Sequence, residues 1–78
     1  MNIYKTNCTE LKKYMIENNI KTIVELSKKT GIGRNTLSKV LEGKEQPSSD
    51  TMEKLVFVLK IPPRTAGDIF FSQTLLDT

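Results

Sequence analysis

The sequence predicts an all-α fold made of five short helices. Apolar residues recur at three- and four-residue steps along most of the chain, which is the pattern of helices that bury one face. No segment shows the alternation of apolar and polar residues that is typical of a strand. The length of 78 residues suits one domain, so we expect residues 1–78 to form a single unit, with a core over about residues 9–71 and a tail over residues 72–78.

The first helix is expected to run from about Thr9 to Asn19. Asn7 or Thr9 can cap its start, and Asn7 stands three residues before Glu10, which is the spacing of a capping box. Residues at three- and four-residue steps form one face, which we expect to point inward: Leu11, Tyr14, Met15 and Asn18.

The second helix is expected to begin at Thr22, because Thr22 and Glu25 form the T-x-x-E pattern of a capping box. It should end at Thr30, since Gly31 is suited to the left-handed conformation that closes a helix. Ser27 lies in the middle of this helix, and its small side chain allows a neighbouring helix to approach closely.

The third helix begins at Gly33 or Arg34 and ends before Gly43. At 100° per residue, three apolar side chains cluster on one side: Leu37, Val40 and Leu41. The opposite side carries polar residues: Asn35, Ser38, Lys39 and Glu42. Two helices joined by a three-residue turn that contains glycine form a helix-turn-helix.

Ser48 or Ser49 is expected to cap a fourth helix, whose apolar stripe consists of Met52, Leu55, Val56 and Leu59. Pro62 and Pro63 should end that helix. A short fifth helix follows around residues 64–71, in which Ile69 and Phe70 are the best candidates to close the core. Large apolar side chains are unfavourable on the surface of so small a protein, so the remaining ones are candidates for contacts between two copies: Phe71, Leu75 and Leu76.

The composition argues against an enzyme. The chain has no His and a single Cys, Cys8, so it offers neither an internal disulfide nor the usual catalytic or metal-binding clusters. We expect no cofactor, no metal and no small-molecule ligand. The longest apolar run, Leu55 to Leu59, is far shorter than the roughly 20 residues of a membrane span. We therefore expect a cytoplasmic protein without a membrane partner.

Positive charge is concentrated in one part of the chain. Residues 21–44 contain six cations and two carboxylates, a local net charge of +4, while the remainder carries −1 of the total of +3. Such a patch attracts polyanions, although a solvated lysine face is the alternative. Lys5, Lys12 and Lys13 lie outside the patch and are interpreted as solvated, but lysines near the first helix can reach a flanking phosphate.

The stretch TIVELSKKTGIGRNTLSKVLEGK, residues 22–44, resembles the helix-turn-helix of the Cro/CI (XRE) family of phage and bacterial repressors. The residues that match in register are Leu26, Ser27, Gly31, Ile32, Leu37, Val40 and Gly43. The likeness continues through PSSDTMEKLVFVLKI and GDIFF, so it covers about residues 11–71. It implies a compact five-helix, lambda-repressor-like DNA-binding domain. It also implies a sequence-specific transcriptional regulator of the phage or mobile-element type, which inserts the helix of residues 34–42 into the major groove of an operator.

The resemblance assigns roles to individual residues. Positions that read bases in the family are occupied by Arg34, Asn35, Ser38 and Lys39. Positions that contact the DNA backbone are occupied by Thr22, Ile23, Gly33, Thr36 and Lys44. The chemistry is suitable, because Arg can bridge the two acceptors of guanine and Asn can pair with adenine. The expected partner is double-stranded DNA with a near-palindromic operator, bound by a homodimer.

Three positions depart from the family pattern. Ile23 stands where the family often has Gln, so only its backbone amide can contact a phosphate, and Gly33 replaces the usual Ser cap. Glu42 has the wrong charge for a phosphate, unless it accepts from a cytosine amine or pairs with Lys39 or Lys44. A second class of function also fits the sequence. It is a protein-interaction module, or the antitoxin of a two-protein system, with the anchors Leu41, Phe71 and Leu75.

Overall fold

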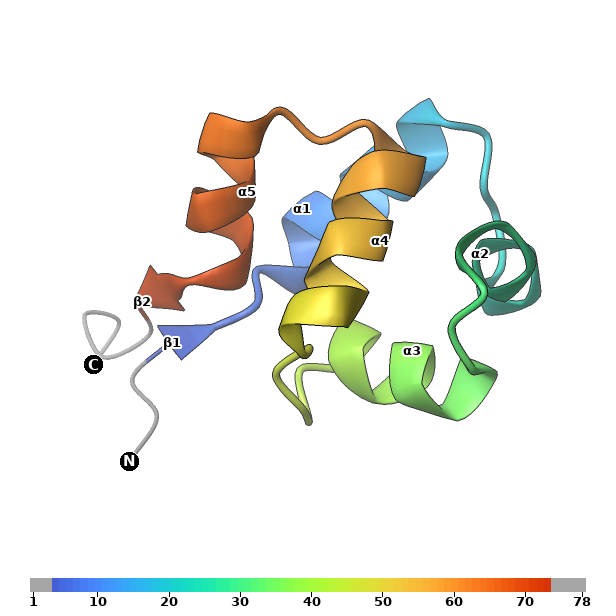
Figure 1. The fold of residues 1–78 in the computed structure, drawn as a ribbon, viewed down its shortest axis with the longest axis horizontal. Helices are drawn as coiled ribbons and strands as arrows, with labels where there is room; N and C mark the ends of the chain where they lie inside the picture. Colours follow the sequence, from blue (N-terminus) through green and yellow to red (C-terminus); the bar gives the residue numbers. More distant parts are fainter. Residues whose placement is uncertain (1–3, 74–78) are drawn as a thin grey trace.

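A computed structural model describes residues 4–73 of the chain and contains the five expected helices (Figure 1). Their bounds are Cys8–Glu17 for α1, Ile23–Thr30 for α2, Arg34–Leu41 for α3, Ser49–Leu59 for α4 and Pro63–Phe70 for α5. The all-α prediction is confirmed, and each helix lies within two residues of its expected position.

A short antiparallel ladder, which the sequence did not predict, joins the two ends of the described chain. Strand β1, Tyr4–Lys5, pairs with strand β2, Ser72–Gln73, beside α5 (Figure 1). Two residues are too few to show an alternating pattern, so the ladder depends on α1 and α5 bringing the ends together. Residues 72–73 therefore belong to the folded part and not to a tail. Residues 74–78 lie outside the described part.

Three helices begin at side-chain caps that the sequence predicted. In each, the cap accepts the N–H three residues ahead: Asn7 from Glu10 at 3.2 Å, Thr22 from Glu25 at 3.1 Å, and Ser48 from Thr51 at 3.2 Å. The capping box of α2 differs in one detail, because the Glu25 carboxylate accepts the N–H of Lys21 at 3.0 Å, one residue before Thr22. These local bonds fix where α1, α2 and α4 start.

The prolines between α4 and α5 act differently from the prediction. Helix α4 ends at Leu59, and Lys60 closes it in the left-handed conformation with a φ of 55°. Pro62 precedes α5 and Pro63 is its first residue. The prediction that these prolines end α4 was wrong, because proline is favoured in the first turn of a helix, where its missing N–H is not needed.

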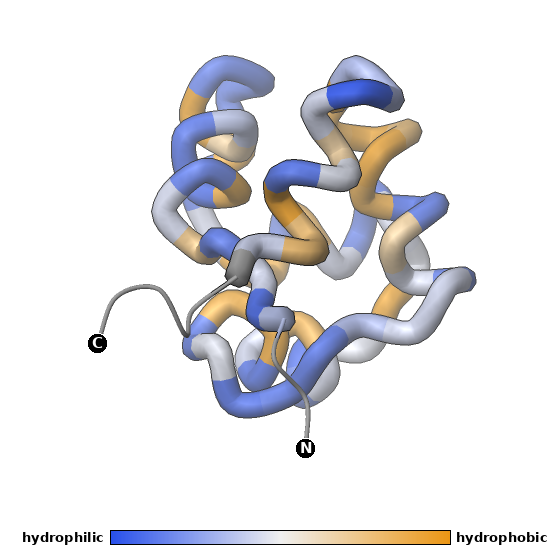
Figure 2. The backbone as a smooth tube through the Cα atoms, turned by 90° about the vertical axis from the view of Figure 1, so that its left-hand side faces the viewer, coloured by the Kyte–Doolittle hydropathy of each residue, from blue (hydrophilic) through white to orange (hydrophobic). Residues whose placement is uncertain are grey.

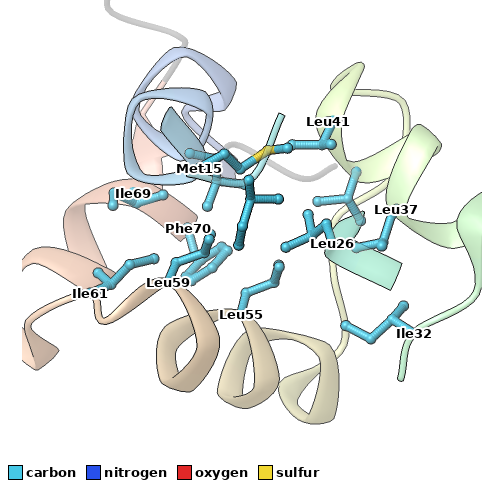
Figure 3. Close-up of a cluster of buried hydrophobic side chains, with 13 residues drawn as sticks. Met15, Leu26, Ile32, Leu37, Leu41, Leu55, Leu59, Ile61, Ile69 and Phe70 are labelled. Carbon is cyan, nitrogen blue, oxygen red and sulfur yellow. The ribbon is translucent and has the colours of Figure 1, made fainter. Parts of the chain in front are cut away.

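All five helices contribute to one apolar core (Figure 3). Its buried side chains are Leu11, Met15, Ile20, Leu26, Ile32, Leu37, Val40, Leu41, Leu55, Leu59, Ile61, Ile69 and Phe70. Hydrophilic and hydrophobic stretches alternate along the chain in Figure 2, as expected for helices that each bury one face. The prediction that Ile69 and Phe70 close the core is confirmed.

Candidate nucleic-acid interface

The turn between α2 and α3 consists of residues 31–33 and is held by its own backbone and two hydroxyl groups. Gly31 is left-handed, with a φ of 78°, as predicted. The N–H of the buried Ile32 donates to Thr30 Oγ1 at 3.1 Å, and its carbonyl accepts from Ser27 Oγ at 2.6 Å. Ser27, which was expected only to make room for a helix, therefore also fixes the turn.

Helix α3 lies along one edge of the molecule, beside α2 (Figure 1). Its apolar side chains Leu37, Val40 and Leu41 are buried, as the helical wheel predicted. The other side carries four exposed polar residues: Arg34, Asn35, Lys39 and Glu42. Ser38 on the same side is half-buried. A helix of eight residues is about 12 Å long, which is close to the width of the major groove of B-DNA.

The residues expected on the DNA backbone surround the starts of α2 and α3. Thr22 and Gly33 are the exposed N-caps of the two helices, and Thr36 is half-buried in the first turn of α3. Gly33 makes no side-chain cap bond, and a Cβ there would meet nothing within 4 Å. The space around Gly33 therefore admits a larger residue. Lys44 is exposed just after α3.

A comparison with protein families identifies the domain that carries these residues. The model of the Cro/C1-type HTH DNA-binding domain matches residues 10–70, which is most of the chain. The chain belongs to this Cro/C1-type family. Comparisons with curated proteins and with solved structures found no match. The predicted resemblance is confirmed, and the matched range includes every residue expected to contact DNA.

Lys12, which the sequence analysis allowed to reach a flanking phosphate, and Lys21 from the positive patch lie around one hollow. A hollow of about 490 Å³ between α1, α2 and α3 is lined by Lys12 and Lys21 together with Ile23, Ser38 and Glu42. This grouping could not be predicted from the sequence, because the residues come from three separate segments. Only the packing of α1 against α3 places Lys12 near α3.

Glu42, which directly follows α3, is held by two neighbours. Lys44 Nζ lies 3.0 Å from Glu42 Oε1, and Ser38 Oγ donates to Glu42 Oε2 at 3.2 Å. The hydrogen bond from Lys44, followed by that from Ser38, lowers the pKa of Glu42 below the ordinary value of a glutamate. Of the partners proposed for Glu42, the pairing with Lys44 is therefore present.

The surface around α4 and α5 carries exposed aromatic residues. Phe57 on α4 is 84% exposed and Phe71 after α5 is 51% exposed, and both line a hollow of about 550 Å³ between the two helices. Phe71 also meets the Tyr4 ring edge to face, with the ring centroids 6.0 Å apart. The sequence analysis missed Phe57, although it stands outside the apolar stripe of α4.

Two candidates for protein contacts change. Leu41, expected as an exposed anchor in the second hypothesis, is only 6% exposed and belongs to the core, which corrects that expectation. Leu75 and Leu76 lie outside the described residues. Among the helices of residues 4–73, none is long and apolar enough to cross a membrane.

Proposed function

We propose that this protein is a sequence-specific transcriptional regulator, of the phage or mobile-element repressor type, that reads an operator with α3. The observation that carries the proposal is the division of α3 into two faces. Its buried leucines and valine anchor it to the core, while Arg34, Asn35 and Lys39 remain exposed. Membership of the Cro/C1-type family makes DNA the partner. A regulator of this kind would act in the cytoplasm.

Base reading is assigned to the first two turns of α3. Arg34 and Asn35 enter the groove first, and Ser38 and Lys39 follow one turn later. The DNA backbone is contacted by the free N–H groups at the starts of α2 and α3, and by Lys44 at the other end of α3. The residues in this second group are Thr22, Ile23, Gly33, Thr36 and Lys44. We add Lys12 and Lys21, because they share a hollow with Ile23 and Ser38.

The protein is proposed to bind a near-palindromic operator as a homodimer. Phe57 and Phe71 support this, because large exposed apolar side chains around one hollow are unusual on a small monomer. A two-fold dimer spaces its recognition helices about 34 Å apart, or one turn of DNA. Phe71, Leu75 and Leu76 remain the proposed dimer contacts, and Phe57 joins them. Sedimentation of the wild type and of Phe57→Asp tests this point, since the variant should become monomeric.

Selection of sites from a random DNA pool, followed by gel shifts at several salt concentrations, tests the function. Arg34→Ala should lose about 1–3 kcal/mol of discrimination between the selected site and random DNA. Lys44→Ala should weaken both kinds of DNA alike and reduce the salt slope by about 1. Lys54→Ala is the matched control, because Lys54 forms an ion pair of the same 3.0 Å length with Asp50 on α4. A wild-type protein that forms no saturable complex at low salt would contradict the proposal.

A second candidate is a protein-interaction module or an antitoxin, which the exposed Phe57 favours. It predicts that Phe71→Asp or Phe57→Asp abolishes binding to a protein partner. Absence of a DNA complex at low salt, combined with that loss, would favour this candidate over the first. The two functions are compatible in an antitoxin that also binds DNA.

A further inference from the structure

The DNA-facing side of α3 ends in a negative charge, and this inference rests on the proposed function. Glu42 directly follows α3, and Asn35, Ser38 and Glu42 follow one another at steps of three and four residues along one stripe. A carboxylate in a DNA groove is repelled by the phosphates unless it gains a specific partner there. The position of Glu42 therefore requires an explanation.

The local bonds make this end of α3 an acceptor surface. Ser38 Oγ donates its only proton to Glu42 Oε2, so the hydroxyl can offer only lone pairs to a further partner. Glu42 accepts from Lys44 through its other oxygen, and its lowered pKa agrees with a carboxylate that is ionised at neutral pH. The side chains of Lys44 and Glu42 are 72% and 51% exposed, so their ion pair is of the weak surface kind and can be exchanged.

We propose that Glu42 reads a base of the operator by accepting a hydrogen bond from the N4 amine of a cytosine. On binding, Lys44 leaves Glu42 for a phosphate, and the cytosine amine takes its place. Cytosine fits better than adenine, because adenine presents the N7 acceptor next to its amine and a carboxylate opposes that acceptor. Guanine and thymine present O6 and O4 acceptors, so the carboxylate disfavours both. Glu42 is therefore a specificity-determining residue.

The test compares the sites selected from a random DNA pool by the wild type, Glu42→Gln and Glu42→Ala. Gln has the size of Glu but offers both a donor and an acceptor, which matches adenine. The preference at one half-site position should change from cytosine to adenine in Glu42→Gln and disappear in Glu42→Ala. For the wild type, replacing that cytosine by thymine should weaken binding by about five- to a hundredfold, and Glu42→Ala should remove most of this difference.

Glu45→Gln is the matched control, because it removes the same charge from an exposed residue three positions further on, outside α3. It should leave the preferred base unchanged, whatever it does to overall affinity. A thermal melt of each variant checks folding, and the thymine substitution tests the wild type without any variant.

The possible outcomes separate this inference from the proposed function. Identical base preferences in the wild type and Glu42→Gln would overturn the role of Glu42 and leave the regulator intact. A switch that also occurs in Glu45→Gln would likewise overturn it. A wild-type protein that selects no site would overturn the proposed function, and the reading by Glu42 with it.

Discussion

The helix pairs α2–α3 and α4–α5 are joined by the same kind of connection, although their sequences differ. Each connection has three residues, 31–33 and 60–62. The first residue of each connection is left-handed, with φ values of 78° for Gly31 and 55° for Lys60. The second is a buried isoleucine, and the third is an extended residue that precedes the next helix without a side-chain cap. The two turns are thus alike in backbone conformation.

What differs is the surface that each pair leaves outside. The α2–α3 pair exposes Arg34, Asn35 and Lys39, whereas the hollow between α4 and α5 is bordered by Phe57 and Phe71. The backbone of a helix pair therefore does not by itself make a DNA-reading unit. The side chains that remain exposed after the core has formed separate the proposed DNA face from the proposed protein face.

The two turns are also held by different segments. In the first, Ser27 of the same helix pair donates to the carbonyl of Ile32 at 2.6 Å. In the second, Asn18 after α1 donates to the carbonyl of Leu59 at 2.9 Å, across 41 residues of sequence. The side-chain bond at the first turn therefore comes from the pair itself, while the one at the second comes from a distant segment and adds to the local bond from the N–H of Ile61 to the carbonyl of Val56 at 3.0 Å.

The largest effect on stability is expected in the apolar core, to which the helix pairs α2–α3 and α4–α5 both contribute. Phe70→Ala should lower the free energy of unfolding by about 3–5 kcal/mol, because Phe70 is fully buried and the cavity cannot close completely. Urea unfolding followed by circular dichroism measures the loss. Ile16→Ala is the control, because Ile16 is 72% exposed and outside the proposed dimer contacts, and it should alter stability by less than about 0.5 kcal/mol. Equal losses in the two variants would contradict the assignment of Phe70 to the shared core.

The next prediction contrasts the first residues of the two turns. Gly31→Ala should destabilise the protein by about 1–2 kcal/mol, because a side chain disfavours the left-handed conformation. A Cβ at Gly31 would meet nothing within 4 Å, so the effect arises from the backbone alone. Lys60→Ala should be nearly neutral, since a side chain is already present in that conformation. Thermal unfolding of both variants checks this prediction. A neutral Gly31→Ala would contradict it, because it would show that residue 31 accepts a side chain in the left-handed conformation without cost.

A smaller effect tests the local support of the first turn. Ser27→Ala should destabilise by about 1 kcal/mol, because the carbonyl of Ile32 loses its hydrogen bond. Ser49→Ala, in the exposed first turn of α4, is the control and should change little. The measurement is again urea unfolding. Stability unchanged by Ser27→Ala would mean that the turn is fixed by Gly31 and Ile32 alone.

The smallest effect concerns the residue before α3. Gly33→Ser should stabilise the protein by a few tenths of a kcal/mol, roughly the difference between Ser and Gly as N-caps. The substitution has room, and α3 has no side-chain cap at present. A higher melting temperature by calorimetry is the expected result, whereas a lower one would indicate that Ser cannot adopt the capping rotamer there.

Much of the fold was predictable because its signals are local. The caps Asn7, Thr22 and Ser48 each bond an amide three residues away, and Gly31 closes α2 through its own backbone conformation. The division of α3 into buried and exposed faces follows from its helical period. The roles proposed for the exposed residues toward DNA come from the family resemblance, and they remain predictions.

Other features arise only when distant segments pack together. The ladder of β1 and β2 forms because α1 and α5 bring the ends side by side, and Gln46 bonds both Thr6 and the Phe70 carbonyl. Lys12 and Ser38 line one hollow because α1 packs against α3. Such contacts join residues more than 20 positions apart, and a helical period or a capping pattern carries no record of them. Local sequence thus set where the helices begin and what they bury, while packing between distant segments set which charged and aromatic groups came to share a surface.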